Sequence, residues 1–508
     1  MRAFPIRSLR VAALVFAVVG TTLLQLIAAS PNEPESLTVD PSFNPALKVS
    51  PGWGSPFVTE ILLRGDRIII VGAFDSVSGS TRANLARLNL DGSLDPGFVP
   101  SLSPGPILRG NPALPRIHEE AGLITFWSVP RGPDGGFLPP SLVRLSSDGR
   151  LDSTYAHLVG VNRSALSLVH PYAPLLLAQD DGRMLFAALM GEFATPTGHR
   201  EMIDLFRLDK RGQLDPDFHA RLVAGDGWPF SSMQIESAAA MTDGRILIAG
   251  YLSLVNGVKR PGFARLLPNG ALDPSFDPTA AFNRIFNPDR AFDLINDVHH
   301  VDFNFALQPD GKVIIVGAGE NQDLVHRLKS DGSLDTTFQL DESVSRFGDA
   351  GRAWVQPDGK ILLAADNRQA AERKVQLLRI LPDGGLDPSF RAISADHEIY
   401  SLVRLPDGSW LIGGSFTQVD GVPRAGLARL FGGPQATATL GVSQSAGRIK
   451  LTMTSARRVR ALLETSADLT SWLPLRTNIA DGVTLEFEDA DAAKHRHRFY
   501  RAQVLVEP

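Results

Sequence analysis

The sequence predicts an all-β fold, namely a seven-bladed β-propeller of four-stranded antiparallel blades followed by a small C-terminal β-sandwich. Three observations lead to this prediction. A motif of roughly 60 residues recurs seven times, each copy contains two hairpin turns, and short alternating strands without the motif follow the last copy. We expect residues 31–433 to form the propeller and residues 434–508 to form the sandwich.

The N-terminus has the features of a signal peptide. Several arginines precede an apolar run that ends at the small residues Ala28, Ala29 and Ser30. We therefore expect residues 1–30 to direct export, so that the protein is secreted or resides in the cell envelope. The apolar run is also close to the length that spans a bilayer, and an uncleaved anchor is the alternative. Such an anchor would be the protein's only contact with a membrane.

The first hairpin of each copy is clearest where residues 308–312 read Gln-Pro-Asp-Gly-Lys. Proline presets the backbone at the second position of such a turn, and glycine accepts the left-handed conformation at the fourth. Runs rich in branched residues flank this turn and predict two strands. A second hairpin follows in six copies, and two hairpins make the four antiparallel strands of one blade.

The second hairpin places an arginine opposite an aspartate. In the first complete copy, the three-residue loop 90–92 sets Leu88 opposite Leu94 and Arg87 opposite Asp95. We expect these ion pairs to be exposed, to contribute about 0.2–1 kcal/mol each and mainly to fix the strand register. The seven pairs are Arg87 with Asp95, Arg144 with Asp152, Arg207 with Asp215, Arg265 with Asp273, Arg327 with Asp335, Arg379 with Asp387, and Arg429 with Asp40.

The two ends of the array each carry half of a copy. The first Asp-x-x-Phe string, residues 40–43, has no Arg-Leu pair before it, and the last pair, Arg429 and Leu430, has no such string after it. We therefore expect residues 39–43 to form the outer strand of the seventh blade. This strand would cover an edge that otherwise invites aggregation.

The motifs Arg-Leu-x-x-Asp-Gly-x-Leu-Asp-x-x-Phe and Gln-Pro-Asp-Gly-Lys resemble the delta-60 repeat, a propeller-forming family of exported bacterial proteins. The resemblance covers roughly residues 39–431 and implies an architecture but no particular activity. The second copy departs most, because Tyr155 replaces its closing phenylalanine. Residues 463–472 and 498–502 resemble a small immunoglobulin-like module found at the C-termini of secreted bacterial proteins.

Composition excludes several classes of function. A formal net charge of −5 gives no electrostatic reason to expect nucleic acid or an anionic membrane surface as a partner. The chain contains no cysteine, so disulfides, thiolate catalysis and cysteine-ligated zinc are excluded. We expect no cofactor.

Four short segments resemble functional sites, and each has a simpler interpretation. Residues 89–95 have oxygen-bearing side chains at the spacing of a calcium loop but lack the remaining ligands, and residues 64–66 form an Arg-Gly-Asp tripeptide that resembles an integrin-binding motif; we interpret both as turns. His299, His300 and Asp302 form a cluster, but adjacent histidines on a strand point to opposite faces, which disfavours a metal site. His495 and His497 lie among basic residues and are interpreted as solvated surface. We therefore assign no catalytic, cofactor-binding or metal-binding residue.

These observations favour a non-catalytic exported scaffold that binds a protein or a glycan through blade loops. Residues 99–116, 219–233 and 277–300 are candidate loops on the propeller faces. The alternative is a polysaccharide-active enzyme with a site at the mouth of the propeller channel. Propeller enzymes assemble such sites from loops of different blades, and a linear motif does not reveal them.

Overall fold

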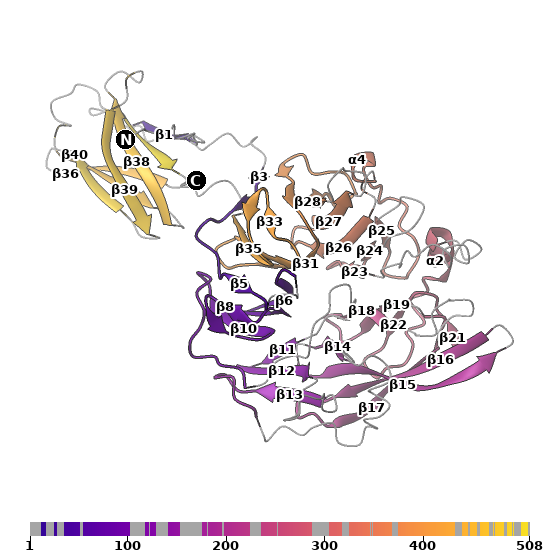
Figure 1. Ribbon diagram of the computed structural model, residues 1–508. Coiled ribbons are helices and arrows are strands. Elements are labelled where there is room, and N and C mark those ends of the chain that lie inside the picture. Colours follow the sequence, from indigo (N-terminus) through magenta and orange to yellow (C-terminus); the bar gives the residue numbers. More distant parts are fainter. Residues whose placement is uncertain are drawn as a thin grey trace.

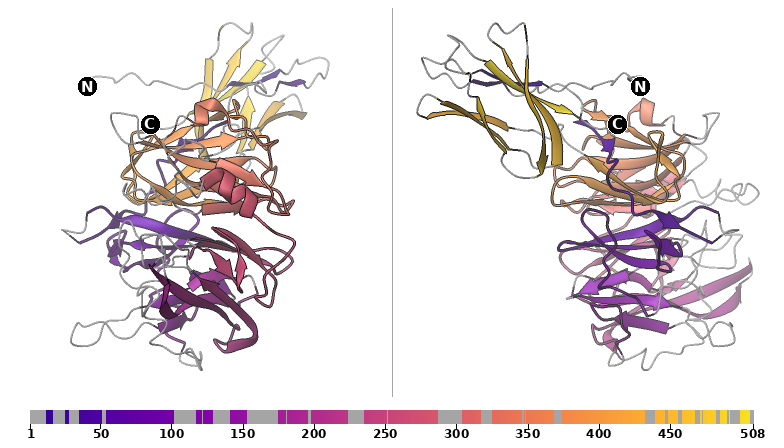
Figure 2. Two further views of the ribbon diagram at one scale, coloured as in Figure 1. Left: turned by 90° about the vertical axis from the view of Figure 1, so that its right-hand side faces the viewer. Right: turned by 60° about the vertical axis from the view of Figure 1, so that its left-hand side comes forward.

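The computed structural model covers most of the repeat array and much of the C-terminal region (Figures 1 and 2). It describes residues 12–16, 25–27, 35–50, 54–101, 117–120, 122–128, 141–152, 175–179, 181–195, 198–223, 235–250, 252–286, 304–316, 325–345, 347, 349–367, 374–431, 439–445, 448–454, 458–466, 471, 473–481, 485–489, 491 and 499–505. The described part is predominantly β-structure and contains two short helices, α2 (Thr279–Phe286) and α4 (Glu342–Ser345). Helix α2 lies within residues 277–300, which the sequence predicts as a loop.

Each repeat contributes antiparallel strands to one sheet, and the first strands surround the centre of the ring in Figure 1. We number the repeats 1 to 7 by these first strands, which are β6 (Phe57–Arg64), β11 (Ile117–Glu120), β14 (Leu175–Ala178), β18 (Ile235–Ala240), β23 (Asn304–Leu307), β26 (Asp349–Val355) and β31 (Ile399–Arg404). The second strands are β7 (Arg67–Ala73), β12 (Leu123–Ser128), β15 (Met184–Thr195), β19 (Ile246–Gly250), β24 (Val313–Val316), β27 (Ile361–Asn367) and β32 (Trp410–Gly414). The third strands are β10 (Leu85–Asn89), β13 (Ser141–Leu145), β16 (Gly198–Leu208), β22 (Phe263–Leu266), β25 (Val325–Leu328), β28 (Lys374–Ile380) and β35 (Leu427–Phe431).

The fourth strand is shorter than the sequence predicts. In five repeats it is a single bridge, as between Leu88 and Leu94. Full strands occur in repeat 3, as β17 (Leu214–Val223), and in repeat 7, where β4 (Thr38–Val39) pairs with β35. After the bridge, the aspartate accepts a hydrogen bond from the backbone N–H two residues on, as at Asp95 and Asp273.

Small additional strands join neighbouring repeats at the ends of the sheets that lie away from the two hairpin turns. Hairpins formed by β8 (Ser76–Val77) with β9 (Ser80–Thr81), β20 (Leu254–Val255) with β21 (Val258–Lys259), and β33 (Gln418–Val419) with β34 (Val422–Pro423) extend three of the repeats. The chain leaving the preceding repeat adds a strand to each hairpin, namely β5 (Leu47–Lys48), β17 and β30 (Ile393–Ala395). Near the N-terminus, β3 (Glu35–Ser36) pairs in parallel with β29 (Phe390–Arg391).

The hydrophobic core lies between the faces of neighbouring sheets. One cluster joins Leu362 and Leu377 of repeat 6 to Ile412 and Leu430 of repeat 7. Another joins Leu411 of repeat 7 to several side chains of repeat 1. Because the branched residues of each second strand pack on both sides, strands β19, β24 and β32 are buried throughout.

The last and first repeats are in contact. Val39 pairs with Leu430 on β35, and the backbone N–H of Asp40 donates to the Arg429 carbonyl at 2.8 Å. The backbone N–H of Ile61 on β6 donates to Ser401 Oγ on β31 at 3.1 Å. An N-terminal segment therefore completes the last sheet with the predicted pairing of Val39 and Leu430, although the paired strand covers residues 38–39 rather than 39–43.

The C-terminal region forms two sheets that lie apart from the repeats (Figures 1 and 2). One contains β36 (Thr439–Ser445), β37 (Arg448–Thr454) and β40 (Leu485–Asp489), and the other contains β38 (Arg458–Ser466), β39 (Leu473–Asp481) and β41 (Phe499–Leu505). Tyr500 is fully buried and its hydroxyl donates to Asp489 Oδ2 at 3.0 Å, which links the two sheets.

Part of the segment expected to be a signal peptide is described as β-structure. Strands β1 (Ala12–Phe16) and β2 (Gln25–Ile27) extend the second C-terminal sheet, with β1 next to β41. Among the described helices, none is long and apolar enough to cross a membrane.

Candidate functional site

The recurrent arginine and aspartate of each repeat are in direct contact. The arginine Nε donates to the aspartate Oδ2 in all seven pairs, at 2.6 to 2.8 Å. The pairs are less exposed than the sequence suggests. In repeat 4, the side chains of Arg265 and Asp273 are only 3% and 4% exposed. The expected exposure was therefore wrong for this pair, because the next repeat covers it.

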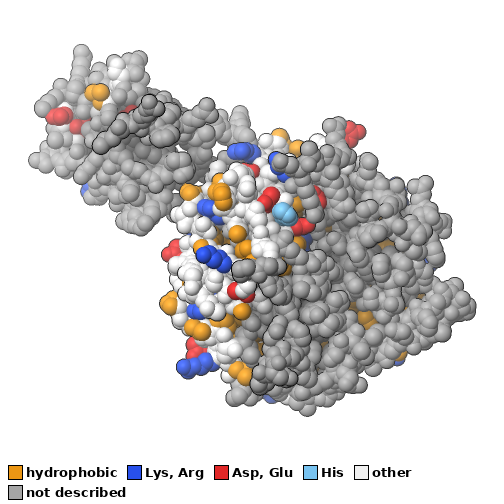
Figure 3. All heavy atoms as spheres, in the orientation of Figure 1, with side chains coloured by type: hydrophobic (Ala, Val, Ile, Leu, Met, Phe, Trp, Pro, Cys, Tyr) orange, Lys and Arg blue, Asp and Glu red, His pale blue; other side chains and the backbone are white. Residues whose placement is uncertain are grey.

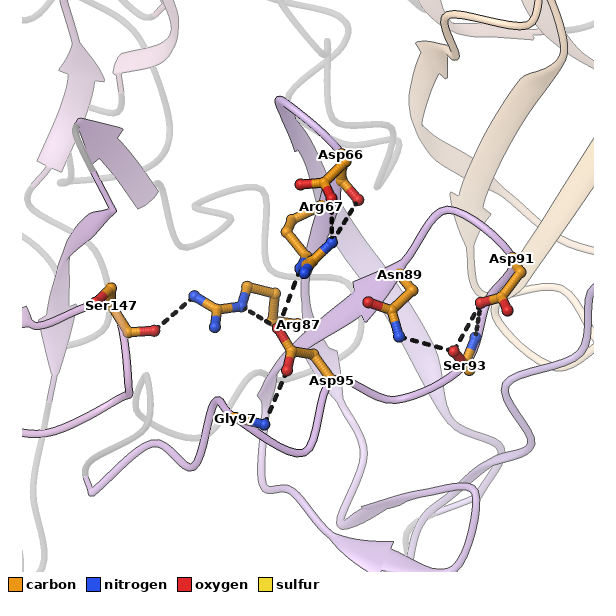
Figure 4. A network of polar contacts seen from close by, with 9 residues as sticks. All are labelled: Asp66, Arg67, Arg87, Asn89, Asp91, Ser93, Asp95, Gly97 and Ser147. Carbon is orange, nitrogen blue, oxygen red and sulfur yellow. Dashed lines mark hydrogen bonds and ion pairs between the residues drawn. The ribbon is translucent and has the colours of Figure 1, made fainter.

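Six of the seven arginines also donate a hydrogen bond to a turn carbonyl of the next repeat. Arg87 Nη1 donates to the Ser147 carbonyl at 2.6 Å, as Figure 4 shows, and Arg265 Nη1 donates to the Ser330 carbonyl at 2.7 Å. Arg429, in the last repeat, donates in the same way to the Leu90 carbonyl of the first, at 2.9 Å. The guanidinium therefore binds an aspartate in its own repeat and a turn carbonyl in the next one.

In six repeats the closing phenylalanine packs beneath the same guanidinium, whereas the closing residue of repeat 2, Tyr155, lies outside the described residues. The distance from the arginine Cζ to the ring centroid is 4.7 Å for Arg87 over Phe98 and 5.0 Å for Arg429 over Phe43. Such contacts contribute about 0.5–2 kcal/mol, depending on how far the cation is desolvated. The arginine, aspartate and phenylalanine of the motif thus form one unit.

The second hairpin turn is also docked on the preceding repeat. The backbone N–H of Gln339 donates to the Asp383 carbonyl of the next turn at 2.8 Å. Gly384 in that turn has φ +100°, and a Cβ there would lie 2.3 Å from the Gln339 carbonyl oxygen. The sequence shows why a turn glycine is needed, but the close approach of a second repeat also requires it.

Two of the motif aspartates, Asp273 and Asp387, are held in their ionised form. Burial alone would raise the pKa of Asp273, but hydrogen bonds from Ser275, Arg265 and Arg245 outweigh burial and hold the pKa far below its usual range. For Asp387, burial is likewise outweighed by hydrogen bonds from Ser389 and Lys360, and its pKa is also strongly lowered. These carboxylates are not proton donors near neutral pH.

The calcium-like segment 89–95 uses its oxygens internally. Asp91 Oδ1 accepts hydrogen bonds from the backbone N–H and the hydroxyl of Ser93, and Asn89 Nδ2 donates to Ser93 Oγ (Figure 4). Asp95 is bound by Arg87 and Arg67. In the part of the chain that the structure describes, no group of three or more His, Asp or Glu side chains is arranged to hold a metal ion.

The Arg-Gly-Asp tripeptide forms the two-residue turn between β6 and β7. Gly65 has φ +57°, Arg64 pairs with Glu119 of repeat 2 at 3.1 Å, and Asp66 pairs with Arg67. His299, His300 and Asp302 lie outside the described residues, as do His495 and His497.

A tier of polar side chains lies on the first strands and was not found from the sequence. It occupies one register position, four residues before the start of the first hairpin turn, in repeats 1, 4, 5, 6 and 7. We call this set the inner tier; its members are Glu60, Ser237, Asn304, Arg352 and Ser401. Aligning the seven copies on their turns would have shown it as a position where the residue type varies, in contrast to the recurring motif residues.

The inner tier contacts the free edges of neighbouring first strands. Asn304 Nδ2 donates to the Gly351 carbonyl at 3.0 Å, and Ser401 Oγ accepts the hydrogen bond from the Ile61 backbone N–H. The strand register shifts just before the tier residue in repeats 1, 4, 6 and 7. Such bulges redirect side chains at the rims of β-structures.

Basic and acidic side chains are interspersed on the face of the described residues shown in Figure 3. On this face they form no extended patch of one sign that would steer a polyanion to the surface.

Five segments of the chain match a family model described as a beta-propeller domain of unknown function, DUF5122. The matched residues are 66–98, 242–276, 308–338, 356–390 and 405–431. The chain therefore carries β-propeller repeats. Four of the five matches end on the phenylalanine of the Asp-x-x-Phe string, so the family model spans the arginine, aspartate and phenylalanine unit described above.

Solved structures similar to this chain are distant. A prolyl endopeptidase has a TM-score of 0.38 and 13% identity, with coverage of 79% of this chain and 54% of that one. An exo-β-1,3-galactanase from Clostridium thermocellum has a TM-score of 0.21 and 10% identity over 80% of this chain and 98% of that one. A glycoside hydrolase has a TM-score of 0.19 and 10% identity over 77% of this chain and 94% of that one. No curated protein matches the sequence.

Proposed function

We propose that this protein is a non-catalytic exported scaffold that binds a protein or a glycan. In this proposal the repeats close into a seven-bladed propeller of the delta-60 type, residues 434–508 form an immunoglobulin-like sandwich, and residues 1–30 direct export to the cell envelope or the medium. The contact of Arg429 with the Leu90 carbonyl supports closure of the ring. The buried bond from Tyr500 to Asp489 supports packing of the two C-terminal sheets.

One observation carries the functional proposal: the recurrent polar residues are used to join repeats. The arginine binds its aspartate, the phenylalanine ring and the next turn, and the turn glycine makes room for the preceding repeat. The shared sequence therefore specifies a rigid ring. Positions that differ between repeats are then free to vary for ligand binding, as in other repeat proteins.

The test is a binding and degradation screen on purified residues 31–508. We expect the protein to bind a glycan on an array, or to capture a protein from an envelope extract by cross-linking, without releasing reducing sugar from polysaccharides. Released sugar would contradict the scaffold and favour the alternative, a polysaccharide-active enzyme.

Export is tested separately on the full chain. Cells producing residues 1–508 are fractionated, and the mass of the exported protein is measured. We expect a product that begins near residue 31, whereas an intact N-terminus in the membrane fraction would indicate an uncleaved anchor.

A further inference from the structure

Two of the first strands, β23 and β26, are partly open to solvent. Every residue of β23 and residues 351–355 of β26 are partly exposed, although successive side chains of a strand point to opposite faces. The adjacent second strand β24 is buried at every position. Each of these first strands has a sheet neighbour on one side and a free edge on the other. Because both faces of the strand are partly exposed, solvent lies at the free edge. Figure 1 shows these free edges around the centre.

The inner tier lies on the first strands and contains two charged residues, Glu60 on β6 of repeat 1 and Arg352 on β26 of repeat 6. Both are partly exposed. Strand β31 of repeat 7 contacts both β26 and β6, so it lies between the two charged residues. The bulge of β31 falls between Ile399 and Ser401, at the partly exposed Tyr400.

Tyr400 is held in place by a neighbouring ring. Its centroid lies 6.5 Å from that of Phe57 on β6, in an edge-to-face arrangement. Along one arc, three consecutive repeats thus present the inner-tier guanidinium of Arg352, the phenol ring of Tyr400 next to the inner-tier Ser401, and the inner-tier carboxylate of Glu60. None of these three positions belongs to the recurrent motif.

We propose that Arg352, Tyr400 and Glu60 form a binding site for a neutral oligosaccharide at the centre of the ring. A guanidinium donates to, and a carboxylate accepts from, adjacent hydroxyl groups of a sugar. A partly exposed aromatic ring packs against the apolar face of a pyranose. One positive and one negative charge favour a neutral chain over a uronic acid polymer. This inference rests on the proposed binding function and assigns it a place and a ligand class.

The experiment is titration calorimetry of the purified exported protein with four neutral hexasaccharides: cellohexaose, laminarihexaose, xylohexaose and maltohexaose. Hexagalacturonate serves as the anionic probe. We expect at least one neutral probe to bind, and its affinity to fall at least tenfold in each of R352A, Y400A and E60Q. The matched control, S237A, changes the inner tier in repeat 4, outside the arc, and should leave affinity within twofold. Y400F keeps the ring, so it should bind like the wild type even if Y400A folds poorly.

The outcomes distinguish failure of the oligosaccharide site from failure of the proposed binding scaffold. Equal affinity of the wild type and the three variants would overturn the inner site but leave the binding scaffold in place. Binding of hexagalacturonate alone would overturn the neutral ligand class. Capture of a protein without any bound glycan would overturn the oligosaccharide site and retain the scaffold. Failure of both glycan and protein binding would overturn both proposals.

Discussion

At the scale of single residues, the motif aspartate has two roles that the sequence shows only in part. Hairpin register predicts its position opposite the arginine, because a three-residue loop fixes which residues face each other. The register does not predict burial, since the covering turn comes from the next copy of the repeat. A linear reading therefore treated Asp273 as half of a weak surface pair, whereas its side chain is 4% exposed and contacts two arginines.

Replacing Asp273 with asparagine removes the charge that both Arg265 and Arg245 contact. We expect a loss of about 3–5 kcal/mol in the free energy of unfolding, because the buried guanidinium of Arg265 is left without its counter-charge. Urea denaturation followed by tryptophan fluorescence measures this change. The control is D310N, since Asp310 forms an ion pair with Lys312 but is 52% exposed, and it should cost at most about 1 kcal/mol. Similar losses in the two variants would contradict the role of burial.

The lowered pKa values of Asp95, Asp273, Asp335 and Asp387 predict sensitivity to acid. In each case the folded-state pKa lies below that of the unfolded chain, so the unfolded state takes up protons first as pH falls. The stabilisation is fully present above the unfolded carboxyl pKa of about 4 and is lost as pH falls below it. Thermal melts from pH 7 to pH 2 test this: the difference between the wild type and D273N should shrink below about pH 4. A difference that stays constant to pH 2 would argue against the linkage.

At the scale of elements, the second hairpin is both a turn and an inter-repeat contact. Its glycine could be predicted from turn geometry, because only glycine adopts the required left-handed conformation without strain. The docking of the turn could not be predicted, since its partner lies in another copy with no sequence signature of its own. The same limit applies to the inner tier, whose members share a register position but have no residue type common to all of them.

Two glycine substitutions separate these effects. In G384A the new Cβ would meet the Gln339 backbone at 2.3 Å, whereas in G257A it would meet no atom within 4 Å, although both glycines have positive φ. We expect G257A to cost about 1–2 kcal/mol from the left-handed backbone alone, and G384A to cost clearly more. Equal urea midpoints for the two variants would show that the turn of residues 381–384 does not dock on repeat 5.

At the scale of the whole molecule, the split motif at the two ends of the array is the strongest evidence for a closed ring that the sequence contains. It predicts that residues 39–43 return to the last repeat, and Val39 does pair with Leu430. It does not predict the bond from Arg429 to the first repeat, nor the addition of β1 to the C-terminal sheet. Those contacts depend on how sheets meet in space, which local pattern does not encode.

The absence of cysteine from the chain allows closure to be tested with a single engineered disulfide. Val39 and Leu430 are paired across β4 and β35, so V39C and L430C together should form a bond that joins the ends of the array. In the loop-entropy treatment, closing so long a segment stabilises the folded state by roughly 5–6 kcal/mol relative to the same variant after reduction. Melting the double variant with and without reductant measures that difference, and each single variant should show none.

Gel mobility without reductant shows which chain supplies the closing strand. A monomer that migrates faster than its reduced form means that residues 38–39 complete the ring of their own chain. A covalent dimer means that the strand is exchanged between two copies, a known hazard when a terminal strand is the last element to dock. We expect the monomer, because Arg424 Nη2 also donates to the carbonyls of Asp40 and Pro41, and the parallel pairing of β3 with β29 holds the preceding residues on repeat 6.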